Sequence, residues 1–339
     1  MKKRKKIIIS IFSSIMGIIL LIVFILYGPI SYFRELLITS AMTTMTHQYL
    51  ATWFYSDETI DAVLKKHNIV EVFEESNPDL ITIKNYDKNI TKFESETEEE
   101  ILKKDSNSDL YKVISIKGSG YSGYLVVIYD PTKIKVATAS TMLESGETLD
   151  KIAKDNNALI AINGTGYIDP FWSGNGSTPL GSVIQNGILT YVGTNPDVGG
   201  GIFGFTKEGK LILSKKNNEE MLKKGIVEGL EYGPFLIVNG KKSRVIGNGG
   251  SGIAPRTAIG QRQDGIVLFL VIDGRQIHSF GANMDDLVEI MLKYKAYNAV
   301  NLDGGASSAL IINNKIINSP SGKSENGLRK IPTALIVTK

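Results

Sequence analysis

Four segments place polar, chemically competent residues at the ends of apolar runs, with glycine close by. They are ALIAINGTGY (158–167), APRTAIG (254–260), VIDGRQ (271–276) and NLDGGASSAL (301–310). Glycine lets the backbone approach a ligand closely and offers amide N–H groups to an anion, while carboxylates can act as acid or base. A single segment of this kind is typical of a plain turn, since Asp-Gly is common in turns. The four together favour a site built on strand-end loops.

Several other chemistries are excluded or disfavoured by composition. The chain has no cysteine, which removes thiolate catalysis, disulfides, iron–sulfur clusters and cysteine-bound zinc. Its three histidines form no H-E-x-x-H pattern, so a histidine zinc site is disfavoured. The GASSA segment at 305–309 approaches a nucleophile elbow, but no histidine follows Ser307, as an α/β-hydrolase would require. A P-loop sequence is also absent.

Two stretches fit the pattern G-x-G-x-x-G, at 118–123 and 247–252. A dinucleotide site needs a strand before this pattern and a helix N-terminus after it to hold the pyrophosphate. Both stretches here run into strand-like sequence. We therefore expect a hairpin or a loop at each position.

The charge of the chain is concentrated at its start. The net charge is +3, from 38 basic and 35 acidic residues, and five of the basic residues occupy positions 2–6. Without those five, 33 basic residues face 35 acidic ones. A body so close to neutral has no broad field to attract nucleic acid, so we expect no nucleic-acid partner.

An uncharged run over 7–27 follows the basic cluster. At about 1.5 Å rise per residue it spans roughly the 30 Å hydrocarbon core of a bilayer, which predicts a transmembrane helix in contact with membrane lipid. A cleaved signal peptide is disfavoured because its apolar run is shorter. The basic residues stay inside, so we expect a cytosolic segment at 1–6, a single anchor at 7–30 in the cell membrane, and an extracellular C-terminal domain.

Residues 31–109 are predicted to form a helical stalk and a polar linker. The apolar positions of 31–68 fall near helical spacing, and Ser56 is placed to cap a helix that ends at Lys66. This helical segment either packs as a plain stalk or pairs with a partner membrane protein. The polar, acidic stretch 91–109 is interpreted as a solvated linker.

Residues 110–339 are predicted to form the main domain, of the α+β class, as a β-rich mixed sheet domain with a few packed helices. Two β-branched runs around GSGYSG indicate a hairpin. Helices are expected at 149–156, 219–224 and 284–297. Strands are expected at 111–117, 124–129, 134–138, 158–163, 181–184, 189–192, 202–205, 211–213, 235–238, 257–261, 266–272, 299–302, 309–312 and 333–337.

The order of AING, PRTAIG, VIDGRQ and NLDGGASSAL resembles the phosphodiester glycosidase family over roughly 111–339. Its most specific block, usually LDGGGSS, is LDGGASS at 302–308, with Ala306 in place of a glycine. A second family block, similar to NGGFF, is NGTGY at 163–167. The membrane-anchored form looks like bacterial relatives associated with exopolysaccharide or wall polymers.

The resemblance implies hydrolysis of a sugar-1-phosphodiester at the anomeric C–O bond. We expect no cofactor, apart from the divalent cation of the metal-dependent alternative below. Arg256 would bind the phosphate, with the Gly304 and Gly305 amides as further donors. Asp303 and Asp273 are candidates for base, nucleophile or oxocarbenium stabiliser, and the residues leave this choice open. Asn163 would hold sugar hydroxyls or water. The other substrate-binding candidates are Gly164, Arg275, Ser307 and Ser308.

Two alternatives stay open at this stage. The same arginine and amides would serve a non-catalytic module that binds an anionic polysaccharide and helps its assembly or export. A metal-dependent phosphodiesterase would attack phosphorus instead, with Asp273 and Asp303 holding a divalent cation, although two carboxylates are a thin ligand set.

Overall fold

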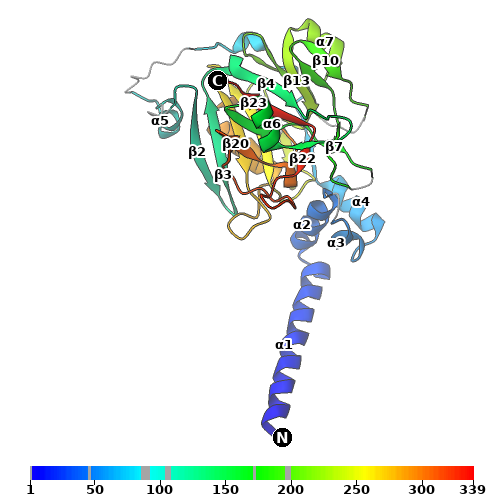
Figure 1. Ribbon diagram of the computed structural model, residues 1–339. Helices are drawn as coiled ribbons and strands as arrows, with labels where there is room; N and C mark the ends of the chain where they lie inside the picture. Colours follow the sequence, from blue (N-terminus) through cyan, green and yellow to red (C-terminus); the bar gives the residue numbers. More distant parts are fainter. Residues whose placement is uncertain (1, 45–46, 85–91, 104–107, 171–172, 195–199) are drawn as a thin grey trace.

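A computed structural model describes residues 2–44, 47–84, 92–103, 108–170, 173–194 and 200–339 (Figure 1). A long helix, α1 (Lys2–Tyr27), projects from a sheet-rich body. Its part from Lys5 to Tyr27 is long and apolar enough to cross a membrane, and its apolar core is not buried against other described residues. The chain therefore has the helix that the uncharged run predicts.

Three short helices follow α1 and form the helical stalk: α2 (Ser31–Met42), α3 (Tyr49–Thr52) and α4 (Asp57–Lys66). Ser56 caps α4 by accepting a hydrogen bond from the Thr59 amide, as predicted, and the helix ends at Lys66. Ile38 and Ala51 are fully buried between these helices. Part of the apolar spacing of the segment thus reflects packing of the stalk helices against one another.

Three antiparallel sheets make up the body of the protein. The largest has the strand order β15-β14-β19-β17-β18-β3-β2, the second β21-β20-β6-β23-β4 and the third β10-β9-β13-β11-β12. The bounds in the largest sheet are β2 (Tyr111–Gly118), β3 (Tyr121–Ile128), β14 (Phe235–Val238), β15 (Lys241–Lys242), β17 (Arg256–Arg262), β18 (Val267–Ile272) and β19 (Ala296–Asn301). Those in the second are β4 (Ile134–Thr138), β6 (Ile160–Asn163), β20 (Leu310–Ile312), β21 (Lys315–Ile316) and β23 (Thr333–Val337). Those in the third are β9 (Val183–Gln185), β10 (Ile188–Tyr191), β11 (Gly201–Thr206), β12 (Leu211–Ser214) and β13 (Ile226–Tyr232).

Three two-stranded ladders complete the sheet system of the described residues. They pair β1 (Asn68–Val70) with β16 (Arg244–Ile246), β5 (Glu147–Thr148) with β22 (Lys330–Ile331), and β7 (Tyr167–Ile168) with β8 (Thr178–Pro179). Single 3₁₀ turns cover Pro78–Leu80, Pro131–Lys133 and Gly305–Ser307. The predicted α+β class with a β-rich domain is confirmed.

The core lies between the inner faces of the three sheets. In strand β18, alternate side chains point to opposite faces of the sheet and so pack into two different layers. Val267, Phe269 and Val271 face the inter-sheet core, whereas Leu268 and Leu270 pack with α8 (Met284–Lys293) on the other face. Because both faces are covered, the strand is apolar throughout. Two further helices, α6 (Leu149–Asp155) and α7 (Asn218–Lys223), lie near their predicted positions.

Helix α8 ends earlier than predicted. An Asn283 capping box with Asp286 begins it, but Lys295 has φ of 59° and β19 starts at Ala296. A left-handed residue stops an α-helix, so the expected extension of this helix to 297 is wrong.

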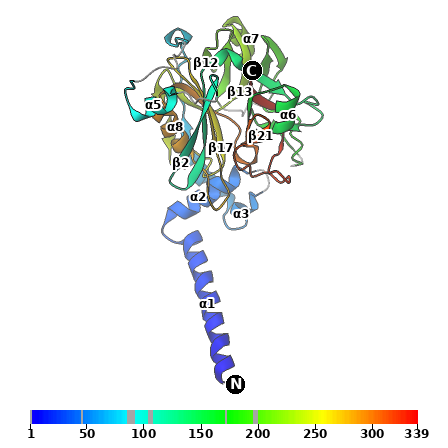
Figure 2. The ribbon, with the colours of Figure 1, turned by 60° about the vertical axis from the view of Figure 1, so that its left-hand side comes forward.

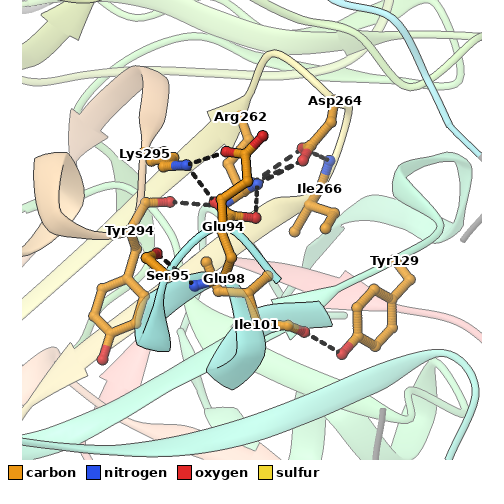
Figure 3. A network of polar contacts seen from close by, with 10 residues as sticks. All are labelled: Glu94, Ser95, Glu98, Ile101, Tyr129, Arg262, Asp264, Ile266, Tyr294 and Lys295. Atoms are coloured by element: carbon orange, nitrogen blue, oxygen red, sulfur yellow. Dashed lines mark hydrogen bonds and ion pairs between the residues drawn. The ribbon is translucent and has the colours of Figure 1, made fainter. Parts of the chain in front are cut away.

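Another short helix, α5 (Glu96–Leu102), lies within the stretch expected to be a solvated linker. Ser95 caps it, and the buried Glu98 forms an ion pair with Arg262 at 3.0 Å (Figure 3). Lys295 lies 2.8 Å from Glu98, and Asp264 binds the other side of Arg262. The helix is therefore fixed to the end of β17, the central strand of the largest sheet, and the acidic composition reflects a buried ion-pair network as well as solvation.

Strand directions bring the four candidate segments to one end of the sheets. Strand β17 is antiparallel to β18 and β19, so Arg256 at its start lies opposite Ile272. By the same rule Ala258 lies opposite Asn301, the last residue of β19. The two G-x-G-x-x-G stretches form the β2–β3 hairpin and the loop between β16 and β17, and neither begins a helix, as predicted.

Candidate active site

A cavity of about 700 Å³ opens where these strand ends meet. Five of the predicted site residues line it, and they are Arg256, Arg275, Asp303, Gly304 and Gly305. The other predicted residues, Asn163, Gly164, Asp273, Ser307 and Ser308, lie behind this lining. The sequence-based set therefore divides into a group at the cavity wall and a group that supports it.

Asp303 is the carboxylate closest to the glycine loop. Its Oδ1 atom accepts a hydrogen bond from the Gly304 amide at 3.0 Å and another from the Tyr232 hydroxyl at 3.4 Å. Burial raises the pKa of Asp303, and these donors together with the charge of Arg275 oppose the rise. The Ser307 hydroxyl also favours the charged form, although its geometry falls short of a hydrogen bond. Asp303 is thus a buried carboxylate with a perturbed pKa, which makes it a candidate functional residue.

Tyr232 is a site residue that the sequence reasoning missed. It ends β13, a strand that was also not predicted, and it lines the cavity. Burial, and then the neighbouring Asp303 charge, raise the pKa of its hydroxyl well above the usual value. The hydroxyl therefore stays protonated and acts as a donor to Asp303.

Arg256 is buried and held by the loop that precedes it and by the segment that precedes α8. Its Nε donates to the Ala282 carbonyl at 3.0 Å, and its Nη2 donates to the carbonyls of Ser251 at 2.9 Å and Gly252 at 2.7 Å. Burial lowers its pKa to about 10, so the side chain still carries its charge at neutral pH. A side chain on Gly304 would meet the Nη1 atom at 3.8 Å, so this nitrogen faces the glycine pair.

Arg275 approaches the same glycine pair from another loop. Its backbone has φ of 60°, a left-handed conformation that is uncommon for a residue with a side chain. A side chain on Gly305 would lie 3.2 Å from the Arg275 Nη2 atom, which shows how closely the guanidinium covers this glycine. Two arginines therefore flank the turn that follows Asp303.

The amides of the glycine pair are engaged within the protein. The Gly304 amide binds Asp303, and the Gly305 amide donates to the Pro255 carbonyl at 2.8 Å. These bonds hold the loop against the start of β17. The guanidinium groups of Arg256 and Arg275 are consequently the better candidates for contact with an anion.

Asn163 supports the Asp303 loop from behind. Its Nδ2 donates to the Asp303 carbonyl at 2.7 Å, and its Oδ1 accepts from the Thr257 hydroxyl at 2.8 Å. The Asp303 amide in turn donates to the Gly164 carbonyl at 3.2 Å. A side chain on Gly164 would come within 2.5 Å of the Thr333 hydroxyl, so only glycine fits there. Asn163 and Gly164 therefore hold the Asp303 loop in position.

Asp273 also lies behind the cavity wall. Its Oδ1 accepts from the Asn318 side chain and from the Ser319 amide, both at 2.9 Å. Asn318 also donates to the Ser308 carbonyl at 3.3 Å. Burial raises the pKa of Asp273, which these bonds partly offset. Asp273 is therefore joined through Asn318 to the strand that follows the DGGASS loop.

Three more cavity residues were not singled out from the sequence. The Asn301 Oδ1 atom and the Tyr167 hydroxyl are buried and have no hydrogen-bond partner among the described residues. The Arg329 guanidinium lies 4.8 Å from the Tyr167 ring centroid. Buried polar atoms normally have partners, so these two are suited to a polar ligand. Asn301 lies in the NLDGGASSAL segment and Tyr167 in the NGTGY segment, and both segments were predicted to contribute to the site. Their place in these segments is the feature of the sequence that could have identified them.

The site thus combines the Asp303 carboxylate, the guanidinium groups of Arg256 and Arg275 and two unpaired polar groups in one cavity, at strand ends of an antiparallel sheet body. The chain belongs to the phosphodiester glycosidase family, whose sequence model matches residues 156–338. The resemblance found in the sequence motifs is confirmed.

Several known proteins are similar to the chain. An uncharacterized SPbeta prophage-derived protein of Bacillus subtilis, YomE, is 28% identical over 205 residues, covering 57% of this chain and 29% of that protein. The N-acetylglucosamine-1-phosphodiester alpha-N-acetylglucosaminidase of Bos taurus is 25% identical over 202 residues, covering 55% of this chain and 37% of the enzyme. The matches thus span well under half the length of these relatives. The solved catalytic domain of the zebrafish enzyme, auto-inhibited by its pro-peptide, has the same fold, with a TM-score of 0.57 at 22% identity, over 69% of this chain and 85% of that one.

Proposed function

We propose that the chain is a hydrolase that cleaves a sugar-1-phosphodiester at the glycosidic bond. The observation that carries the proposal is the position of Asp303, a carboxylate with raised pKa, beside the arginines 256 and 275 in one cavity. Family membership supports the same reaction. The bovine relative, by its name, acts on N-acetylglucosamine-1-phosphodiesters.

The reaction divides into charge stabilisation and proton transfer. Water forms the new bond to the anomeric carbon, and the electron pair of the old C–O bond leaves on the phosphate oxygen. Arg256 and Arg275 stabilise the developing phosphomonoester, which needs less protonation than an alcohol leaving group. Asp303 stabilises the oxocarbenium-like centre and accepts the proton of the water. The products are a free sugar and a phosphomonoester.

Polar groups that lack protein partners would orient the sugar. The Asn301 Oδ1 atom can accept from a sugar hydroxyl, and the Tyr167 hydroxyl can donate or accept. Asn163, Gly164 and Asp273 act as positioning residues in this account. The choice between the two aspartates therefore falls on Asp303 as the one that contacts substrate.

The location of the reaction follows from the anchor. We place α1 in the cell membrane with its basic start in the cytosol, which puts the catalytic domain outside the cell, facing exopolysaccharide or wall-polymer phosphodiesters. Protease added to protoplasts should digest the C-terminal domain. Full protection of that domain would contradict the orientation.

The experiment is an assay of the full chain in detergent on a panel of sugar-1-phosphodiesters. The native protein should release free sugar, and Asp303→Asn should reduce turnover while keeping ligand affinity. Asp285→Asn is the matched control, because Asp285 is an exposed carboxylate on α8 that does not line the cavity. Binding without turnover of any panel member by the native chain would favour the alternative, a polysaccharide-binding module.

A further inference from the structure

The cavity wall is shared between the catalytic domain and the helical stalk. Thr43, Thr44 and His47, from the segment that joins α2 to α3, line the same cavity as Asp303 and Arg256. These residues follow the end of the membrane helix at Tyr27 by at most 20 positions along the chain. Helix α2 has 12 residues, so at 1.5 Å rise it carries the chain only about 18 Å from its start.

The stalk is attached directly to the end of the membrane helix. The Tyr27 hydroxyl donates to the Phe54 carbonyl at 2.8 Å, and the Tyr55 hydroxyl donates to the Leu26 carbonyl at 3.0 Å. The rings of Tyr27 and Tyr55 also contact each other, with centroids 5.8 Å apart. The turn between α3 and α4 is therefore held against the last turn of α1.

The stalk is equally well attached to the catalytic domain. Asn248 donates from its side chain to the Thr39 hydroxyl at 2.6 Å and from its amide to the His67 ring at 3.1 Å. His67 in turn lies 3.0 Å from the Glu35 carboxylate. Strand β1, which follows α4, pairs with β16, and the loop after β16 is the one that holds Arg256. The cavity is thus fixed relative to the end of α1 rather than tethered loosely to it.

The exposed surface of the stalk is suited to a membrane interface. Trp53 is 74% exposed and Tyr32 is 60% exposed, and the Tyr49 and Trp53 rings contact each other at 4.8 Å. Phe33 and Phe54 are also exposed. Aromatic side chains of this kind gather at the headgroup level of a bilayer. Both views show the stalk helices between the end of α1 and the sheets (Figures 1 and 2).

The lining of the cavity is strongly cationic. Besides Arg256 and Arg275 it includes Lys323, Arg329 and Lys330, against the carboxylates of Asp169 and Asp303. This excess of positive charge favours an anionic ligand such as a phosphodiester.

We propose that the substrate is a lipid-linked sugar phosphodiester that enters the cavity from the membrane in which the enzyme is anchored. The inference rests on the proposed function and adds the substrate class. The lipid tail stays in the outer leaflet, the stalk surface contacts the headgroup region, and the sugar phosphate reaches Asp303 past Thr43 and His47.

The test compares two esters of the same sugar-1-phosphate, one with methanol and one with a long-chain lipid alcohol. The full chain is reconstituted in phosphatidylcholine vesicles, with the lipid ester in the same vesicles or in separate ones. When enzyme and lipid ester are in the same vesicle membrane, the effective concentration of the ester at the enzyme is raised. At equal bulk concentration, the lipid ester in the same vesicles should therefore be cleaved roughly 100-fold faster than the lipid ester in separate vesicles or the methyl ester.

A variant on the stalk separates interface contact from catalysis. Trp53→Ser should lower the rate for the lipid ester about threefold or more and leave the methyl ester unchanged, because membrane contact scales with buried apolar area. Ile188→Ser, on β10 at the far end of the body from α1, is 64% exposed and should change neither rate. Equal rates for both esters, with or without a shared vesicle, would overturn the inference and leave the proposed function standing. Failure to cleave either ester would overturn both.

Discussion

The side-chain amide of Asn163 donates a hydrogen bond of 2.7 Å to the backbone carbonyl of Asp303, across 140 positions of sequence. The same side chain accepts from the Thr257 hydroxyl and from the Ala309 amide. One buried residue at the end of β6 therefore holds together the start of β17 and the loop that carries the candidate catalytic carboxylate. The position of Asp303 depends on this contact.

Asn163→Ala should lower both stability and turnover. Each buried group left without its partner costs about 1 to 3 kcal/mol, so the melting temperature should fall measurably. A displaced Asp303 should reduce kcat by on the order of 100-fold in the folded fraction. If Asn163 instead contacts only the sugar, KM would rise while the melting temperature stayed unchanged. Thermal unfolding and steady-state kinetics on the same sample separate these results.

Arg256→Lys should reduce stability as well as activity. Lysine cannot reproduce the donors to Ala282, Ser251 and Gly252, and hydrogen bonds from a charged group are worth about 1.5 to 3 kcal/mol each. The melting temperature and the rate on a phosphodiester should both fall. Near-normal turnover in this protein would remove Arg256 from the phosphate site.

Arg275→Lys is the companion variant, because Arg275 is exposed at the cavity and faces Gly305. It should lose roughly tenfold or more in kcat/KM, as expected when a planar fork for phosphate becomes a point charge. The melting temperature should change little. A large loss of stability with normal turnover would assign Arg275 to the fold instead.

Tyr232→Phe should shift the acidic limb of the pH–rate profile. The hydroxyl favours the charged form of Asp303, so its removal raises the pKa of this carboxyl further. Activity that needs the carboxylate should then be lost at a higher pH, by up to about one unit, since a pKa unit corresponds to about 1.4 kcal/mol. Rates measured between pH 4 and 8, roughly the range in which carboxyls and histidines titrate, would show the shift. An unmoved limb would mean that Asp303 does not control it.

Glu98→Gln tests the ion-pair network of α5 (Figure 3), whose members Glu98, Arg262 and Lys295 do not line the cavity. Its hydrogen bonds and charges from Arg262 and Lys295 lower the pKa of Glu98 despite burial. Because this carboxyl has a lower pKa in the folded state than in the unfolded state, its ionisation stabilises the fold at pH values above its pKa in the unfolded state. That stability is lost as the pH falls through its pKa in the folded state. Removing one partner of a buried pair costs about 3 to 5 kcal/mol.

The native protein should therefore lose stability toward acidic pH more steeply than the Glu98→Gln variant. Urea unfolding midpoints measured at neutral and acidic pH would show this difference. The kcat of the folded variant should match that of the native protein. Parallel pH dependences would mean that Glu98 is not the group that titrates.

Most of the sheet system could be predicted from the sequence, because its strands are apolar or alternate regularly. The β2–β3 hairpin and the Ser56 cap were expected from local patterns alone. Every expected strand overlaps an observed one. Local chemistry dictates these elements, and the fold retains them.

Strand β13 could not be predicted, because Glu228 and Gly229 interrupt its apolar pattern. Glu228 is nevertheless 2% exposed, since it accepts from the Val136 amide at 2.9 Å and from the Lys135 side chain at 3.2 Å. Partners more than 90 positions away decide the burial of this carboxylate. Tyr232, at the end of the same strand, was missed for the same reason.

The candidate site was predictable as four segments but not as a geometry. Glycine-rich strand ends pointed to Asp303 and Arg256, and the structure brings both to one cavity. The contribution of the stalk through Thr43 and His47 had no local signal, because it depends on how α2 docks on the loop before Arg256. Which residue of a segment faces the cavity is decided by tertiary packing.

The central claim is cleavage of the glycosidic C–O bond with Asp303 as the acting carboxylate. The most direct measurement is hydrolysis of a sugar-1-phosphodiester in water that carries a heavy oxygen isotope, followed by mass spectrometry of both products. We expect the heavy oxygen in the released sugar and none in the phosphomonoester. Asp303→Asn should form both products much more slowly, and Asp285→Asn should form them at the native rate. Heavy oxygen in the phosphate would show attack at phosphorus and would contradict the account.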